Sequence, residues 1–558
     1  MRRRLPASLV FFVITGVVYL LQAFPLTGVF LMILAAAFWS VLLINAGMIG
    51  IAIEALVGRV SRLWLIVPVA FYAGYWHVST ADRAKLSELT AAFEATNAQA
   101  KIPFDPSRHA IVFEGDGGGG AGPWLVQNYG LPVSYSARQK PGDFRSHRMM
   151  EQPVCTRVRE NPALGAADVR AFGFQDGEGI GKRKPAAFCM VSMPEAPELA
   201  IVRVATREEN IVERGLPVRR VTTTVTMPDG RQYRLLGGSA SPLSRWPMPV
   251  MGCALNSGAP SWDCFHGFYR DSFTPIVSGD TRYGRDNVVL AQALGLKRVA
   301  PEQRRSGDAT SVNAKIDAAE AAALARQLAS LDAMIADPLA KVIDWDVGVI
   351  ANRPEVLDAK ADAIMTGIER AAAAAVGDNR YKARESGRIM ARLIAKLPRE
   401  RFVGFGPRLL ALYAAADDEH WLWEAESLIR RLGDLGVGAV PYLVRPKASV
   451  PNVNGAGIEG LCRVGPPAKA AATPLLTAMW AKTRDFDRDE RRALFVAMRR
   501  IGISVPKLSE DKRGQMADME KEWSDISPAS PPRVCAVRAE WQARREEKYS
   551  GKRRTNLE

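Results

Sequence analysis

The chain begins with a long apolar stretch. Not one Asp, Glu, Lys or Arg occurs from Leu5 to Ile53, a run of 49 residues. A helix rises about 1.5 Å per residue and a bilayer core is about 30 Å thick, so the run is about twice as long as one crossing requires. Pro25 and Gly28 mark the expected break, because proline lacks the amide proton that a continuing helix needs. The pattern predicts two transmembrane helices, at about 5–23 and 26–47.

A second uncharged run of 19 residues extends from Leu63 to Ala81. Its aromatic residues suit the two interfacial belts of a membrane helix, and they are Trp64, Tyr72, Tyr75 and Trp76. We therefore expect a third transmembrane helix at about 62–80. Leu86, Leu89 and Phe93 follow at helical spacing between charged residues, which predicts an amphipathic stalk at 82–100.

The positions of the arginines predict the orientation of these helices. Arginines occupy residues 2–4 before the first span, and Arg59 and Arg62 lie between the second and third. Positive charge stays on the cytoplasmic side of short loops, so three crossings place everything after Ala81 outside the cytoplasm. If the third span were only peripheral, the bulk of the chain would be cytoplasmic. A cleaved signal peptide is the alternative for the first span, but no small-x-small cleavage site follows it, so we expect a retained anchor.

The next region has the texture of a β domain. Short β-rich runs are separated by Gly and Pro, and they include Ala110 to Phe113, Val154 to Val158, Phe188 to Ser192 and Leu199 to Ala205. Residues 220–227 and 231–236 alternate in polarity around Pro228-Asp229-Gly230, which predicts a hairpin. We expect a mostly antiparallel β-rich domain over 105–299, followed by a linker at 301–309.

Beyond Thr310 the sequence becomes rich in Ala and Leu with helical periodicity. The predicted helices are 316–335, 356–375, 389–397, 409–416 and 421–432. Four helix ends recur at steps of 35, 32 and 37 residues, namely Pro398, Gly433, Gly465 and Gly502. A glycine after an Arg-rich last turn can adopt the left-handed conformation that ends a helix, and a proline near the next start fits a first turn. The spacing predicts stacked two-helix repeats.

The repeated pattern of Leu-Gly or Val-Gly, a short gap, and Val-Pro or Thr-Pro before Leu resembles HEAT-like α-solenoid repeats over about residues 380–510. This resemblance implies a curved surface that binds other macromolecules, and it implies no reaction. The predicted fold class is a multidomain membrane protein with N-terminal transmembrane α-helices, a mostly antiparallel β-rich domain and a C-terminal all-α HEAT-like solenoid. The predicted boundaries are 1–81 for the anchor, 82–100 for the stalk, 105–299 for the β-rich domain, 310–525 for the helical repeats and 526–558 for a basic tail.

All six cysteines follow the apolar block, and an even number suits an oxidising compartment. Six cysteines allow 15 pairings. We expect the sequential one, in which the candidate disulfides are Cys155 with Cys189, Cys253 with Cys264, and Cys462 with Cys535. The alternative is that some of them are buried free thiols, which behave as small apolar residues.

Charge and composition restrict the classes of partner that suit this chain. With 48% hydrophobic and 24% charged residues the chain has enough apolar material for folded cores. Its 74 Lys and Arg exceed its 59 Asp and Glu by 15, and most of this excess lies after the apolar block. Such a surplus attracts anionic lipid headgroups, acidic envelope polymers or nucleic acid. An external location makes nucleic acid the least suited of these.

Several motifs suggest chemistry but fail on context. Gly115 to Gly120 satisfies G-x-G-x-x-G, yet a five-glycine tract does so by composition alone, and Pro123 and Trp124 do not predict a convincing helix after it. Residues 177–182 lack the first glycine and the Ser or Thr of a phosphate loop. Cys253, Asp263, Cys264 and His266 have metal-binding side chains, but no paired C-x-x-C accompanies them, and a disulfide is favoured. We therefore assign no catalytic, cofactor-binding or metal-binding residue, and we expect no cofactor.

Two acidic clusters have an ordinary explanation. Asp417, Asp418 and Glu419 precede a predicted helix, as does the Asp344-Trp345-Asp346 segment, and carboxylates interact favourably with the positive end of a helix. No opposed partner indicates an acid pair. The sequence favours a non-catalytic binding or scaffold protein of a bacterial-type inner membrane, with its bulk in the periplasm and an envelope protein or anionic envelope surface as partner. The alternative is an envelope-acting enzyme with a site between the β-rich and helical domains.

Overall fold

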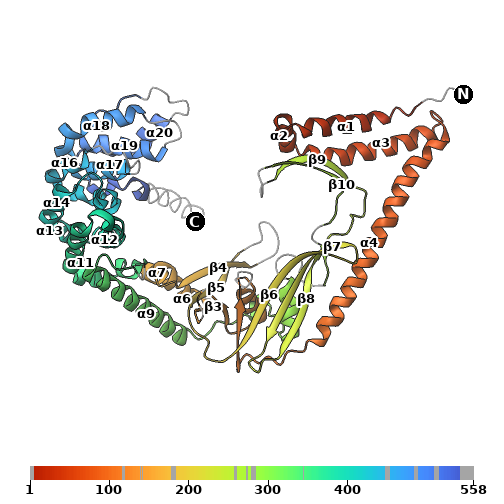
Figure 1. The fold of residues 1–558 in the computed structure, drawn as a ribbon, viewed down its shortest axis with the longest axis horizontal. Helices are drawn as coiled ribbons and strands as arrows, with labels where there is room; N and C mark the ends of the chain where they lie inside the picture. Colours follow the sequence, from red (N-terminus) through yellow and green to blue (C-terminus); the bar gives the residue numbers. More distant parts are fainter. Residues whose placement is uncertain are drawn as a thin grey trace, which may run out of the picture. The chain divides into compact units, whose positions relative to one another are not determined.

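The structure is a computed structural model, and its fold is drawn in Figure 1. It describes residues 5–115, 120–138, 140, 142–176, 184–256, 261–271, 274–277, 285–342, 345–445, 453–482, 488–507 and 515–540. The chain forms two compact units, of which the first is Met1–Cys155 with Ala171–Val312 and the second is Thr156–Arg170 with Asn313–Glu558. The first unit holds the apolar helices and a large mixed sheet, and the second is helical.

The apolar N-terminus folds as a helical hairpin. Its elements are α1 (Leu9–Ala23), α2 (Pro25–Ile33), the 3-10 turn η1 (Ala36–Phe38) and α3 (Trp39–Leu56). The backbone amides of Ala7 and Ser8 both donate to the carboxylate of Glu54, so the start of α1 lies beside the end of α3 and the two helices are antiparallel. Among the described residues, only Ala36–Leu56 is by itself long and apolar enough to cross a membrane, while α1 and α2 qualify only as a pair bent by 115°.

The second apolar helix begins later than the sequence predicts. The expected span was 26–47, whereas the helix breaks after α2 and α3 begins at Trp39. Ala35 between them has φ 51°, a left-handed conformation that a side chain rarely adopts and that interrupts a helix. The apolar run therefore has two breaks, at Phe24 and around Ala35. The second was not predicted, because composition alone does not mark a break that lacks Gly or Pro.

The predicted third span and stalk form one helix, α4 (Ile66–Gln99), which follows η2 (Arg62–Leu65). Pro68 is tolerated because it occupies the first turn, where its missing amide proton has no helical partner. Unlike Ala36–Leu56, α4 is not among the described helices that are long and apolar enough to cross a membrane. Further along α4, Leu89 and Phe93 are buried in a cluster with residues of the large sheet, Leu216, Val218, Ala240 and Ile276.

The large sheet is mixed, which corrects the expectation of a mostly antiparallel domain. In the described residues its strands run in the order β11-β8-β7-β6-β1-β2-β3-β5-β4. β1 pairs in parallel with both β2 and β6, and the other pairs whose register is defined are antiparallel. The strands are β1 (His109–Glu114), β2 (Ser134–Ala137), β3 (Phe144–Glu151), β4 (Arg170–Asp176), β5 (Lys184–Pro194), β6 (Ala200–Glu213), β7 (Leu216–Thr226), β8 (Gln232–Ala240) and β11 (Thr274–Pro275).

Helices interrupt the region that the sequence predicts as β-rich. α5 (Ala121–Tyr129) connects the parallel strands β1 and β2, and α8 (Arg285–Ala293) joins it in the same apolar core. α6 (Gln152–Glu160) contains the segment Val154 to Val158, which we expected to be a strand, and α7 (Pro162–Ala166) follows. Val154, Cys155 and Val158 are all buried, and their spacing fits one face of a helix rather than the alternation of a strand. The expected hairpin is present as β7 and β8, with Gly230 at φ 84° in its turn.

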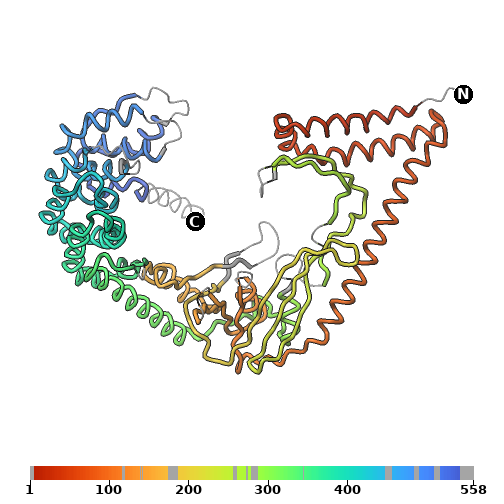
Figure 2. The backbone as a smooth tube through the Cα atoms, viewed as in Figure 1, coloured from red at the N-terminus to blue at the C-terminus, as the bar shows by residue number. Residues whose placement is uncertain are grey.

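A second sheet consists of β9 (Pro249–Asn256) and β10 (Ser261–Phe268), which pair in antiparallel register with Cys264 opposite Cys253. β9 contacts α1, α2, η1 and α3 rather than the large sheet (Figure 1). In Figure 2 this yellow-green hairpin runs beside the red N-terminal helices. The hydroxyl of Ser40 donates a hydrogen bond to the carbonyl of Pro249, which is 209 residues further along the chain.

The second unit is helical, and among its described residues a large apolar cluster is shared by helices from α9 to η9. Its longest helices are α9, α11 and α12, and the linker expected at 301–309 contains η4 (Pro301–Gln303) and the first residue of α9. The elements are α9 (Ala309–Ala336), α10 (Gly348–Ala351), α11 (Pro354–Ala374), η5 (Gly377–Asn379), α12 (Arg380–Ile394), α13 (Arg399–Gly404), α14 (Gly406–Ala415), η6 (Trp421–Glu424), α15 (Glu426–Leu432), η7 (Gly433–Ala439), α16 (Val440–Leu443), α17 (Val453–Val464), η8 (Pro466–Ala468), α18 (Lys469–Lys482), α19 (Arg488–Ile501), α20 (Gln515–Glu522) and η9 (Pro532–Cys535).

One type of contact occurs three times in these helices, each time between partners with nearly the same sequence separation. An arginine donates to a carbonyl at the end of an earlier helix, which lacks an intrahelical partner. The pairs are Arg370 with Ile335, Arg431 with Ala395, and Arg500 with Cys462, separated by 35, 36 and 38 residues. These separations are close to the steps of 32 to 37 residues between helix ends in the sequence.

The glycines that the sequence assigned to helix ends have two different roles. Gly465 and Gly502 have φ of 77° and 83°, the left-handed region that favours glycine. Gly433 does not, since its φ is −59°. A Cβ on Gly433 would lie 2.0 Å from the carbonyl oxygen of Gly460, so glycine is required there because α15 and α17 cross closely.

Candidate functional site

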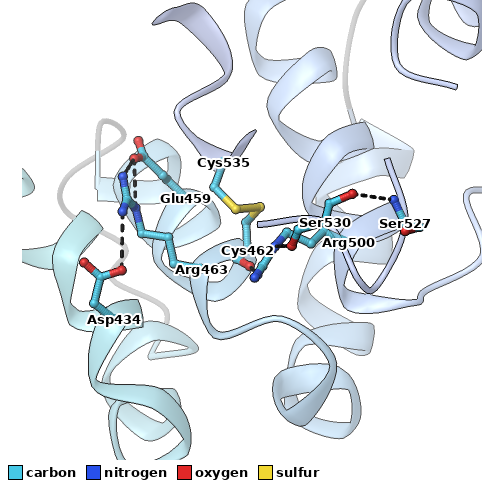
Figure 3. Close-up of a disulfide and its surroundings, with 8 residues drawn as sticks. All are labelled: Asp434, Glu459, Cys462, Arg463, Arg500, Ser527, Ser530 and Cys535. Carbon is cyan, nitrogen blue, oxygen red and sulfur yellow. Dashed lines mark hydrogen bonds and ion pairs between the residues drawn. A yellow bond between two sulfur atoms is a disulfide. The ribbon is translucent and has the colours of Figure 1, made fainter. Parts of the chain in front are cut away.

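The three predicted cysteine pairs all lie at bonding distance. Their S–S distances are 2.12 Å for Cys155–Cys189, 2.06 Å for Cys253–Cys264 and 2.07 Å for Cys462–Cys535. Figure 3 shows the last pair beside Arg500, whose guanidinium donates to the carbonyls of Cys462 and Ser530. Disulfides of this kind persist in oxidising compartments, so their presence in both units suits an oxidising environment for both.

The second of these disulfides removes the metal site that the sequence left as an alternative. Cys253 and Cys264 bond to each other across the hairpin, which leaves only Asp263 and His266 of the four candidate ligands. Over the described ranges, no group of three or more His, Cys, Asp or Glu side chains has the geometry to hold a metal ion.

The glycine-rich segment after β1 has a structural context that the sequence did not predict. A helix, α5, does follow it. Pro123 is compatible with this helix because it occupies the first turn. β1, α5 and β2 thus form a parallel crossover. Residues 116–119 of the glycine tract lie outside the described residues, as does the segment 177–182, so the structure assigns no nucleotide site to either.

A buried imidazole links three strands of the large sheet. Nε2 of His147 on β3 lies 2.9 Å from the hydroxyl of Ser136 on β2, and Nδ1 lies 3.0 Å from the hydroxyl of Ser192 on β5. His147 is only 6% exposed, and burial, with a smaller contribution from Arg145, lowers its pKa to about 4. Since both ring nitrogens are already bonded to hydroxyls and the ring is shielded from solvent, this neutral imidazole acts as a bridge between strands.

The second unit presents a cationic pocket along α12. Its volume is about 230 Å³, and it takes Arg384, Arg388 and Arg392 from one face of the helix. These arginines are spaced by four residues, which places them one above the other. The rest of its lining is Glu385, Ile389 and two aromatic side chains that are open to solvent: Trp345 is 54% exposed and Tyr381 is 65% exposed.

Acidic residues only partly neutralise this pocket. The carboxylate of Glu424 lies 2.8 Å from Nε of Arg384 but 4.0 Å from Nη1 of Arg388. The guanidinium of Arg384 also lies over the ring of Tyr381, 5.8 Å from its centroid. Arg392 is exposed at the end of the row. A guanidinium that is held in place and not fully paired is suited to bind a carboxylate or phosphate through its planar donors.

The acidic residues near this pocket do not have the role that the sequence predicted for all of them. Asp417 and Glu419 form ion pairs with Arg380, and Asp418 pairs with Arg445, instead of capping the start of a helix. At the start of η6 the capping residue is instead His420, whose ring nitrogen Nδ1 accepts a hydrogen bond from the amide of Leu422.

The other acidic segment was predicted to cap a helix. Asp346 accepts from the amide of Gly348 at the start of α10, at 2.8 Å, which is the expected role. Asp344 lies outside the described residues.

The sequence did not lead to the cationic pocket, although one signal was present. Arg384, Arg388 and Arg392 repeat at helical spacing within a segment that also contains Arg380 and Lys382. Reading this spacing would have identified a cationic helix face. The contribution of Trp345, from a loop nearly 40 residues earlier, could not be read, because it depends on how the chain returns in three dimensions.

Comparison with known proteins adds no assignment, since no protein family, curated protein or solved structure matches the chain. The fold itself defines a broad class. One N-terminal apolar helix together with three disulfides is typical of an exported or membrane protein.

Proposed function

We propose that this protein is a membrane-anchored, non-catalytic binding protein of the cell envelope. The N-terminal helices hold it in a bacterial-type inner membrane, its N-terminus is cytoplasmic, and both folded units lie in the periplasm. The helical unit is a HEAT-like repeat array that binds an anionic envelope partner.

Three observations support this arrangement. The helix Ala36–Leu56 is apolar enough to cross a bilayer. Disulfides in both units suit an oxidising exterior. Three arginine contacts support a repeat, because each one links a helix to the end of an earlier helix across a similar separation of 35 to 38 residues.

The α12 pocket carries the functional part of the proposal. At about 230 Å³ it is smaller than pockets for drug-sized ligands, which are about 300–1,000 Å³, so it fits one unit of a larger molecule. Its arginines select a carboxylate or phosphate, and the faces of Trp345 and Tyr381 supply rigid, flat contact area. These features together favour an acidic saccharide, the chemistry of an anionic envelope polymer.

Binding of a defined acidic sugar to the full chain in lipid nanodiscs tests this proposal. We expect trigalacturonate to bind and its neutral counterpart maltotriose not to bind, because only the first can pair with the guanidinium groups. The double variant Arg388→Gln/Arg392→Gln should weaken binding by about tenfold or more, since each lost charge-assisted bond contributes about 1.5 kcal/mol or more.

The double variant Arg326→Gln/Arg538→Gln is the matched control, because it also removes two positive charges, from exposed positions that do not line the pocket. Its affinity should stay within about twofold of the natural chain, as expected for distant charges screened by salt. Equal losses in the control and in the pocket variant would reduce the effect to net charge and contradict a defined site. Equal binding of the two sugars would also contradict it.

A further inference from the structure

The segment that forms the β9–β10 hairpin is almost without charge. Arg245 and Arg270 enclose 24 residues, and Asp263 is the single Asp, Glu, Lys or Arg among them. A strand needs only about 9–11 residues to cross a bilayer, against about 20 for a helix, so a membrane hairpin does not produce the long apolar run that marks a helix. Hydropathy along the chain therefore overlooks this segment.

The outer edge of β9 is bonded to the apolar helices instead of to another strand. The amide of Met251 donates to Oγ of Ser40 at 2.9 Å, and the amide of Cys253 donates to Oε1 of Gln22 at 3.1 Å. Two carbonyls on the same edge also find donors. Pro249 accepts from Oγ of Ser40 at 2.9 Å, and Pro247 accepts from Nδ2 of Asn45 at 3.0 Å.

The helix side chains that make these bonds are buried. Gln22 is 1% exposed, Ser40 is 3% exposed and Asn45 is 7% exposed. These polar residues interrupt an otherwise apolar run, and an unpaired polar group in an apolar environment is costly. Their partners on the hairpin explain why they are there.

The hairpin and the helices also approach each other closely. A Cβ on Gly252 would lie 2.4 Å from that of Ala37, and a Cβ on Gly28 would lie 2.2 Å from the ring of Trp262. The indole nitrogen of Trp262 donates to the carbonyl of Gln22 at 2.9 Å. A two-stranded hairpin alone is marginally stable, so these contacts and its disulfide fix it against the helices.

Aromatic residues surround the base of the hairpin. The ring of Phe268 lies 4.9 Å from that of Tyr75 and 6.1 Å from that of Phe71, and the ring of Trp246 lies 5.7 Å from that of Tyr72. Trp and Tyr gather in this way at membrane–water interfaces, where their rings lie among the headgroups. Other apolar side chains of the hairpin face outward, since Leu255 is 57% exposed and Phe265 is 44% exposed.

We propose that the β9–β10 hairpin is inserted into the lipid bilayer at its non-cytoplasmic face, alongside α1, α2 and α3. The inference rests on the membrane anchor of the proposed function. The bilayer is the occupant because the outward apolar surface of the hairpin continues that of the helices, on which Leu26 is 81% exposed and Leu42 is 72% exposed. Membrane attachment of the first unit thus involves its β9–β10 hairpin as well as its N-terminal helices.

The free edge of β10 determines the depth of insertion. The amides of Met251 and Cys253 point to the helices, so the backbone groups of their partners His266 and Cys264 point away from β9. In the part of the chain that the structure describes, β10 pairs only with β9. Unpaired backbone groups are not tolerated in the hydrocarbon core, which places this edge at the headgroup boundary.

Photo-crosslinking from single positions tests the proposal in the full chain in native membranes. A photoreactive diazirine analogue of phenylalanine is placed at Phe265, and lipid adducts are measured by mass spectrometry. The same analogue at Leu42 on α3 is the control for the anchor. At Phe172 on β4, an aromatic residue that is 52% exposed, it is the control for an apolar side chain in water. An intact Cys253–Cys264 bond in each variant verifies that the hairpin has formed.

We expect lipid adducts at Phe265 at about the level of Leu42 and about tenfold above Phe172, because only the first two face lipid. Adducts at Leu42 with Phe265 at the level of Phe172 would overturn the insertion of the hairpin and leave the anchor intact. The absence of adducts at Leu42 would contradict the anchor and the hairpin together.

Discussion

Two sets of contacts, one in each unit, bond backbone groups through different kinds of side chain. In the first unit, the edge of β9 is bonded by Gln22, Ser40 and Asn45, none of which carries a charge. In the second unit, the ends of helices are bonded by the arginines Arg370, Arg431 and Arg500. Both sets make long-range bonds from a side chain to a carbonyl or amide, so the geometric task is similar.

The difference follows from the surroundings of each set. Moving an ion into a low-dielectric environment is far more costly than moving a neutral amide or hydroxyl, so neutral side chains suit the apolar helices. Arginine keeps part of its guanidinium near water and gains a stronger, charge-assisted bond. This choice of side chains suits the proposed insertion of the hairpin beside the apolar helices and an aqueous setting for the helical unit.

The largest expected effect is in the second unit, at Arg431. Its guanidinium donates to the carbonyls of Ala395 and Leu397 and pairs with Asp434, which is 5% exposed. Arg431→Met should lower the free energy of unfolding by about 3 kcal/mol, because it leaves a buried carboxylate short of one partner. Urea unfolding of the detergent-solubilised full chain, followed by tryptophan fluorescence, measures the loss.

The neighbouring Arg430 is the matched control for Arg431. It pairs with Glu426 one turn away and more distantly, at 3.7 Å, with Glu459 on α17, and its side chain is 46% exposed. Arg430→Met should cost less than about 0.5 kcal/mol, as is usual for an exposed pair on a helix. If the two variants had equal stability, the arginine contacts would not hold the helices together.

A second effect, about 2 kcal/mol at pH 5, is expected from His147 in the first unit. Its folded pKa of about 4 lies below the ordinary value of 6.5, so between these values the unfolded chain binds a proton that the folded chain does not. Stability should therefore fall as the pH falls through this window. Urea unfolding between pH 5 and pH 7.5 measures the slope.

His147→Gln provides the comparison, because it keeps a polar side chain on β3 but cannot titrate. The variant should lose the part of the pH dependence that belongs to the imidazole, whatever its stability at pH 7.5. An unchanged slope would show that His147 is not the buried neutral bridge between the strands.

The smallest effect is expected at Ser40, on the hairpin side of the comparison. Ser40→Ala leaves the amide of Met251 and the carbonyl of Pro249 without this partner, at a cost of about 1 kcal/mol. Amide hydrogen exchange at Met251 should accelerate by about fivefold, which corresponds to that free energy. Thr15→Ala is the control, since Thr15 is also buried but bonds only to Phe11 in its own helix. Acceleration by Thr15→Ala as large as that by Ser40→Ala would contradict a specific link to the hairpin.

Local patterns in the sequence predicted some elements well. Helical periodicity located α9 and α11 to within a few residues at most ends, and the proline-glycine turn located the hairpin of β7 and β8. The sequential pairing of cysteines put each pair within one region of the chain, and the sulfur atoms lie at bonding distance. These features depend on residues that are near each other in the sequence.

Features that depend on long-range contact were not predictable. The parallel pairing of β1 with β2 and β6 requires a crossover through α5, and nothing local distinguishes it from an antiparallel arrangement. Val154 to Val158 has β-forming residues but is buried on one side as a helix, so tertiary packing overrides propensity. The roles of Gln22 and Asn45 could not be read from the apolar run, because their partners lie more than 200 residues away.

The location of the two folded units can be tested most directly by reporter fusions. One fusion follows residue 60 and the other follows residue 310, and each is made with a phosphatase that is active only after export and with a fluorescent protein that is active only in the cytoplasm. The proposed topology predicts cytoplasmic activity after residue 60 and exported activity after residue 310. Cytoplasmic activity at both positions would contradict it, because the disulfide-containing units would then lie in a reducing compartment.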